Sequence, residues 1–166
     1  MKKIMLCLLI LVSLTVNIHA QDYPYDIALQ LIQEALESGT TELNLSGLGL
    51  TELPPEIWQL SNLQGLHLLY NQLTELPPEI GQLSNLKSLY LNENQLTGLP
   101  PEIGQLSNLE RLSLTYNQLT ALPPEIGQLS NLQRLDLSNT QLMAVPLEWT
   151  YPDKMECKGV SKVQIM

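Results

Sequence analysis

A 23-residue unit repeats along most of this chain. Nearly identical segments begin at Leu63, Leu86 and Leu109, and each continues into N-Q-L-T-x-L-P-P-E-I-G-Q-L-S-N. A single unit of this kind cannot bury its own apolar face, so successive units must stack and bury their leucines against one another. The sequence therefore predicts a row of stacked coils, and this architecture argues against an enzyme.

Five units appear when the same spacing is extended in both directions, and they run from residue 40 to about residue 150. The outer units depart from the common pattern. Leu48 replaces the asparagine of the first unit, and Thr140 replaces that of the last. Atypical end units are expected, because each lacks one neighbour.

The leucines within a unit alternate with polar or variable residues, as in Leu66-His67-Leu68. A period of two residues is typical of a β-strand that is buried on one face. Double prolines such as Pro77-Pro78 come later in the unit. Because proline has no amide hydrogen to donate, it excludes a long helix there and suits a turn.

One asparagine recurs at the tight bend after each inner strand, at Asn71, Asn94 and Asn117. A side-chain amide offers both donors and acceptors, so it can pair with the backbone of a neighbouring coil. We expect these side chains to form a buried ladder rather than to contact a ligand.

The pattern L-x-x-L-x-L-x-x-N-x-L, which runs from Leu63 to Leu73, resembles the leucine-rich repeat family. Its continuation is similar to the 23-residue subclass found in bacterial secreted proteins and in intracellular Ras-group scaffolds. The resemblance implies an α/β solenoid with short parallel strands on a concave face. It also implies irregular or 3₁₀ returns on the convex face.

The first 20 residues have the layout of a secretory signal peptide. Lys2 and Lys3 precede an apolar run from Ile4 to Val16, and Ala20 supplies a small residue before the cleavage point. This run is shorter than the roughly 20 residues that a spanning helix needs. We expect cleavage after Ala20 and a periplasmic or extracellular location; an uncleaved anchor is the alternative.

Residues 21–39 precede the repeats and have a different composition. Between Asp22 and Ser38, apolar residues recur at three- and four-residue steps, which predicts an amphipathic helix. Asp26 suits its start and Gly39 its end. We expect this N-terminal capping helix to cover the exposed core of the first repeat.

Residues 151–166 follow the repeats. Val160, Val163 and Ile165 reproduce the apolar spacing of the repeat strands and predict a sixth parallel strand that shields the edge of the sheet. A frayed tail is the alternative. Cys157 is the one cysteine left after cleavage; it has no partner for an internal bridge, which leaves an intermolecular disulfide or an incidental thiol.

Acidic residues outnumber basic ones. The chain has 17 acidic and 8 basic side chains and a net charge of −9, which becomes −11 once Lys2 and Lys3 leave with the signal peptide. Such a chain repels phosphate backbones, so we expect no nucleic-acid partner. We interpret the charge as a source of solubility.

Constellations for catalysis or metal binding are missing from the sequence. His67 is the one histidine left after cleavage, which is too few for a metal cluster or a triad. No G-x-x-x-x-G-K-[ST] loop is present. About sixteen residues follow Thr150, too few for the catalytic domain of ubiquitin ligases in this repeat class. We expect no enzyme activity and no cofactor.

The candidate binding residues lie between and just after the strand leucines, because they vary while the convex part of the repeat is nearly constant. Equivalent residues of neighbouring strands stand about 4.8 Å apart. We therefore expect Tyr70, Tyr90 and Tyr116 to form an aromatic patch, and an ordinary strand surface is the alternative. The predicted concave binding surface comprises His67, Leu69, Tyr70, Tyr90, Glu93, Arg111, Tyr116, Arg134 and Asp136.

The sequence thus predicts an exported recognition module that binds a protein, or a surface glycan, through its concave face. One alternative is a structural protein that self-associates through the ends of its stack. Another is an intracellular scaffold, if export fails. Five short strands offer roughly 300 Å², less than the about 800 Å² that a standard interface buries per partner. A partner is therefore expected to wrap the rims, or several copies to act together.

Overall fold

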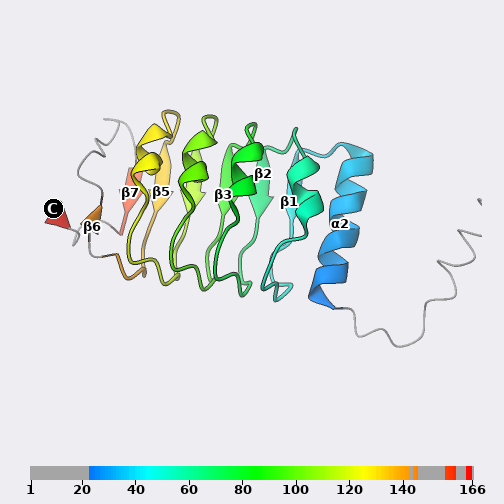
Figure 1. The fold of residues 1–166 in the computed structure, drawn as a ribbon, viewed down its shortest axis with the longest axis horizontal. Helices are drawn as coiled ribbons and strands as arrows, with labels where there is room; N and C mark the ends of the chain where they lie inside the picture. Colours follow the sequence, from blue (N-terminus) through cyan, green and yellow to red (C-terminus); the bar gives the residue numbers. More distant parts are fainter. Residues whose placement is uncertain (1–22, 143, 146–155, 160–163, 166) are drawn as a thin grey trace, which may run out of the picture.

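The computed structural model describes residues 23–142, 144–145, 156–159 and 164–165. One α-helix is followed by coils that stand side by side in a row, with strands on one face and short helical turns on the other (Figure 1). The helix is α2 (Pro24–Ser38). The strands are β1 (Glu42–Asn44), β2 (Gly65–His67), β3 (Ser88–Tyr90), β4 (Arg111–Ser113), β5 (Arg134–Asp136), β6 (Ala144–Val145), β7 (Glu156–Lys158) and β8 (Gln164–Ile165). The 3₁₀ helices are η1 (Pro55–Gln59), η2 (Pro78–Gln82), η3 (Pro101–Gln105) and η4 (Pro124–Gln128).

Six strands form one parallel sheet in the order β1-β2-β3-β4-β5-β7. The register advances by one repeat at each step, so that Leu43 pairs with Leu66 and Leu66 with Leu89. The middle residue of each strand from β1 to β5 is a buried leucine. The predicted parallel sheet, one strand per repeat, is confirmed.

The convex returns contain the predicted 3₁₀ helices. Each begins at the second proline of a pair, for example at Pro78 in η2. Proline suits this first position, because its fixed φ fits the helix and the amide hydrogen it lacks would have no acceptor there. Neighbouring returns approach so closely that a Cβ on Gly104 would lie 2.6 Å from the Glu125 carbonyl oxygen.

The asparagine ladder is present as predicted. In the middle coil, the Asn94 carbonyl oxygen accepts a hydrogen bond from the Leu73 amide at 3.1 Å. The Asn94 amide nitrogen donates to the carbonyl oxygens of Leu68 and Leu91 at 2.8 and 3.0 Å. The asparagines of the two adjacent coils repeat this geometry. Each thus ties its own coil to the one before it.

The end units lack the ladder asparagine, and the residues that replace it make fewer hydrogen bonds. The Thr140 hydroxyl donates to the Leu137 carbonyl oxygen at 2.8 Å, but it bonds to no other coil within the described residues. Leu48 packs against the apolar core instead. At this position the side chain of the last unit therefore supplies one bond of the ladder, and that of the first unit supplies none.

Helix α2 packs against the first coil, at β1 and η1. Three residues of the predicted apolar face are buried, Ala28, Ile32 and Ala35. The helix ends at Gly39, which takes a left-handed φ of 65° and donates its amide to the Ala35 carbonyl oxygen at 3.0 Å. In this position the helix covers apolar surface that would otherwise be open at the end of the row.

The prediction for the sixth strand was wrong in its position. The strand beside β5 is β7, which pairs Leu135 with Cys157 and not with Val163. Ile165 lies in β8, which pairs with β6 in a separate two-stranded parallel sheet. Val160 and Val163 fall outside the described residues, as do residues 1–20. The step from Leu135 to Cys157 is 22 residues, one fewer than the 23 between the other paired strands. The apolar spacing did not reveal this strand, because a cysteine takes the leucine position.

Candidate binding surface

The strands present two rows of side chains to the concave face, on either side of the buried leucines. Side chains of the same row stand on neighbouring strands in register, about 4.8 Å apart. The first row is Glu42, Gly65, Ser88, Arg111, Arg134 and Glu156, and the second is Asn44, His67, Tyr90, Ser113, Asp136 and Lys158.

At the N-terminal end of this face, acidic and aromatic groups lie close together. The Glu42 carboxylate lies over Gly65, in space that any Cβ at this position would fill. It reaches to 3.5 Å from His67 Nε2, a contact that becomes an ion pair when the imidazole is protonated. The His67 ring stacks on Tyr90, with ring centres 4.9 Å apart.

At the C-terminal end of the face, the strands enclose a pocket of about 170 Å³. We call it the basic pocket. Four of its residues were predicted from the sequence, but Lys158 was not, because the sixth strand was expected further along the chain. Its lining consists of Tyr90, Asn92, Arg111, Leu112, Ser113, Arg134, Asp136 and Lys158.

One carboxylate beside the basic pocket holds two of its cations. Glu156 lies 3.0 Å from the Arg134 guanidinium and 3.6 Å from the Lys158 ammonium. The hydrogen bond from Arg134 is the main cause that lowers the pKa of Glu156 below its ordinary value, and the positive charges add to it. Arg111 is engaged far less closely, at 4.0 Å from a carboxylate oxygen of Glu110.

The predicted aromatic patch is divided between two levels. Tyr90 lies in the strand row, whereas Tyr70 and Tyr116 follow the strands at a turn, where they take left-handed φ values of 55°. Glu93 occupies the equivalent turn position between them, and Leu69 is half-buried one residue before Tyr70. No two tyrosine rings stack within the part of the chain that the structure describes. The two turn tyrosines, Tyr70 and Tyr116, are called the rim tyrosines below.

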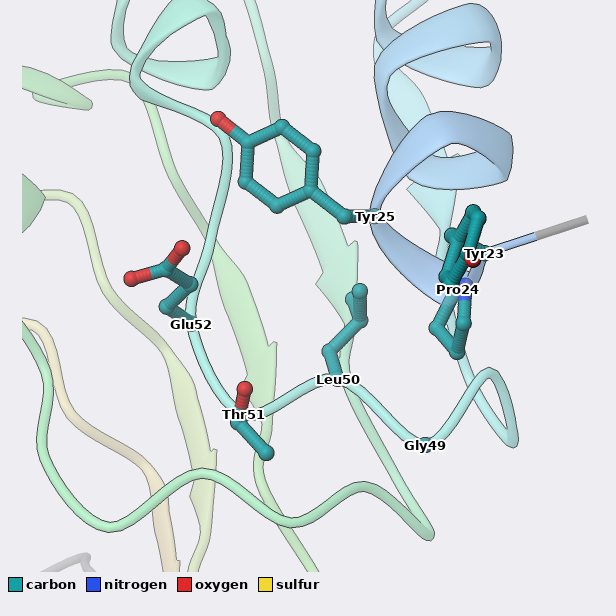
Figure 2. A pocket seen from close by; sticks show the side chains of 7 residues that line it. All are labelled: Tyr23, Pro24, Tyr25, Gly49, Leu50, Thr51 and Glu52. Carbon is teal, nitrogen blue, oxygen red and sulfur yellow. The ribbon is translucent and has the colours of Figure 1, made fainter.

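A larger hollow, of about 310 Å³, lies where α2 meets the first coil. Figure 2 shows Tyr25 on one side of it and Tyr23 with Pro24 on the other, and Leu50 between them. Burial is the main cause that raises the pKa of Tyr25, and nearby carboxylates, first that of Glu56, raise it further. This hollow contains none of the predicted site residues.

A second ladder of amides, which was not predicted from the sequence, runs along the convex side. Asn85 donates to the Ser61 carbonyl oxygen at 2.8 Å, and equivalent bonds link the third and fourth coils each to the coil before it. Asn62 of the first coil makes the same kind of bond to Gly39, at the end of α2. The S-N dipeptide, which recurs in the first four units, was the available signal. These side chains hold coils together and are exposed, so they add a structural role and no binding site.

The described residues contain no group of three or more histidine, cysteine, aspartate and glutamate side chains placed to hold a metal ion. Among the same residues, no helix has the length and apolar character needed to cross a bilayer.

A parallel sheet that advances one coil at a time, backed by 3₁₀ returns, defines a repeat solenoid. Family models agree with this class. One, described as a leucine-rich repeat region, matches residues 42–118, and another, described as two copies of the leucine-rich repeat, matches residues 107–149. Together they cover well over half of the chain, which belongs to the leucine-rich repeat family. Repeats of this family commonly form modules for protein interaction.

A solved structure of a leucine-rich repeat protein from Leptospira interrogans is similar to this chain. The two are 39% identical, with a TM-score of 0.67. The match covers 80% of the present chain but 40% of the other, so this chain spans less than half the length of that protein. No curated protein matches the sequence.

Proposed function

We propose that this chain is an exported recognition module that binds a protein partner through its concave face. The observation that carries the proposal is the state of the rim tyrosines. Tyr70 and Tyr116 are 63% and 55% exposed, although their backbones are held in the left-handed region.

Folding stability does not account for these two residues. A left-handed φ costs an ordinary L-residue roughly 1–2 kcal/mol, and an exposed ring regains little of this through burial. The equivalent positions of the outer repeats carry Gly47 and Asn139, which suit this conformation. Contact with a partner explains tyrosines at these positions, because this side chain is frequent at binding hot spots.

Self-association through the ends of the row has less support. Helix α2 lies over the first coil. At the other end of the six-stranded sheet, β7 has three residues, two of which are Glu156 and Lys158. Short, charged edge strands disfavour the addition of another strand. We therefore place recognition on the concave face.

Export is part of the proposal and rests on the first 20 residues. A basic start, an apolar run and a small residue at Ala20 support secretion across a membrane. Mass spectrometry of the protein from its native cells tests it. A mature chain that begins at Gln21 in the periplasmic or extracellular fraction is the expected result, and a full-length chain in the cytoplasm would contradict it.

Partner capture tests the concave face itself. We would immobilise the wild type, the double variant Tyr70→Gly/Tyr116→Gly and a convex control, Gln82→Ala/Gln105→Ala, and expose each to an extract of the native surroundings. A protein retained by the wild type and the control, but lost by the tyrosine variant, is expected. Equal capture by all three chains would refute the proposal, and a captured glycan would support the alternative ligand class.

A further inference from the structure

We infer that the basic pocket binds an acidic side chain, an aspartate or a glutamate, presented by the protein partner. The inference rests on the proposed function, because it names the chemistry that is recognised at one end of the concave face.

The cations of the described chain gather in the basic pocket. The described residues contain four lysines and arginines, and three of them, Arg111, Arg134 and Lys158, line this one pocket. They are far apart in the sequence, and the strand register brings them together. On a chain with a net charge of −9, this is a local site of opposite sign.

Positive charges outnumber negative ones inside the pocket. Its lining carries three positive side chains and one negative, Asp136, whose carboxylate already accepts the Ser138 amide at 3.1 Å. Glu156 neutralises part of the charge of Arg134 and Lys158 from beside the pocket. Asp136 and Glu156 together offset two of the three positive charges. In the described parts of the chain the third is opposed only by Glu110, which lies outside the lining at 4.0 Å from Arg111, the limit for an ion pair.

Arg111 is the group best placed to receive the ligand. Its guanidinium contacts the Ser88 hydroxyl at 3.5 Å and Glu110 at 4.0 Å, both at the outer limit for such contacts. A guanidinium has five N–H donors in a planar fork that matches a carboxylate. Among the described residues most of these donors have no partner, so they can form a two-pronged bond with an incoming acidic group.

The size of the pocket selects the kind of ligand. Sites for whole small molecules usually have about 300–1,000 Å³, whereas this pocket has about 170 Å³. It therefore fits one side chain of a larger molecule. Tyr90 forms part of the wall and supplies apolar contact for the methylene groups that carry the carboxylate.

An NMR titration of the whole chain tests the inference with two short peptides, one with an Asp-Glu pair and one with Asn-Gln in its place. We expect the acidic peptide alone to shift the backbone signals of Arg111, Arg134 and Lys158. Arg111→Gln should weaken its binding about 10- to 100-fold, the usual worth of a charge-assisted hydrogen bond. Lys87→Gln removes the same charge outside the pocket and should change little.

A variant that binds the acidic peptide more tightly is a useful second test, because misfolding could explain a loss of binding but not a gain. Glu156→Gln removes the carboxylate that competes for Arg134 and Lys158, so it should tighten binding of the acidic peptide severalfold. Equal binding of both peptides, or tighter binding of a heparin oligosaccharide than of the peptide, would overturn the inference. If it fails while the rim tyrosine variant still loses its partner, the proposed function stands; if both fail, the concave face is not the binding surface.

Discussion

Replacing Asn94 by alanine measures what the buried asparagine ladder contributes to stability. Asn94 is 6% exposed. Without it, the Leu73 amide loses its acceptor. The carbonyl oxygens of Leu68 and Leu91 each lose one bond but keep another, at 3.0 and 2.9 Å, from the asparagine of an adjacent coil.

The expected loss follows from these three groups. A buried amide left without an acceptor costs about 1–3 kcal/mol, and each of the two other hydrogen bonds contributes about 0.5–1.5 kcal/mol. The free energy of unfolding should therefore fall by about 2–6 kcal/mol. Because small domains are stable by only about 5–15 kcal/mol, this one side chain accounts for a large share.

Urea denaturation followed by circular dichroism checks the value, with Asn85→Ala as the matched control. Asn85 makes one exposed bond of the convex ladder, to the Ser61 carbonyl oxygen at 2.8 Å, so its loss should cost about 0.5–1.5 kcal/mol. Equal m-values would show that the two variants unfold from comparable states.

Hydrogen exchange shows which backbone amides lose protection when Asn94 is replaced. In Asn94→Ala the Leu73 amide should exchange faster, whereas the Leu96 amide, which is held by Asn117 at 3.0 Å, should keep its protection. A loss no larger than that of Asn85→Ala, or equal acceleration at both amides, would refute the reasoning. The buried ladder would then be a consequence of stacking and not a cause of it.

Three further predictions concern the coil ends, the coil spacing and the pH. Thr140→Asn should add the missing bonds of the ladder and raise the unfolding free energy by about 1–2 kcal/mol in urea. Gly104→Ala, measured in the same way, should lower it by about 1–3 kcal/mol through overpacking, whereas Gly98→Ala, with no atom within 4 Å of its new Cβ, should be neutral or slightly stabilising. The pKa of Glu156 is lower in the folded chain than in the unfolded chain. The stability that its ion pairs add is therefore fully present above the unfolded pKa, and it is lost as the pH falls through the folded pKa. NMR titration should show the midpoint rise in Arg134→Gln.

Local pattern was enough to predict the strands, the returns and the inner ladder. The alternation around Leu66 favours a strand, Pro78 favours the start of a 3₁₀ helix, and the Asn94 amide favours bonds to the backbone. Each preference is expressed within one unit, and the same unit recurs. The pattern failed at β7, where Cys157 takes the leucine position and the return is one residue shorter. A search for apolar spacing does not find such a strand, because pairing with β5 selects it.

The repeat period specifies a row of coils in this protein, because a unit that cannot bury its leucines alone must share them with neighbours. The basic pocket depends on more than this. Arg111, Arg134 and Lys158 become neighbours only when three strands are paired in register. The exposure of Tyr70 and Tyr116 likewise depends on the turn that follows each strand. A cluster of charges and a set of exposed rings each involve residues that are distant along the chain. They therefore form only once the coils have stacked.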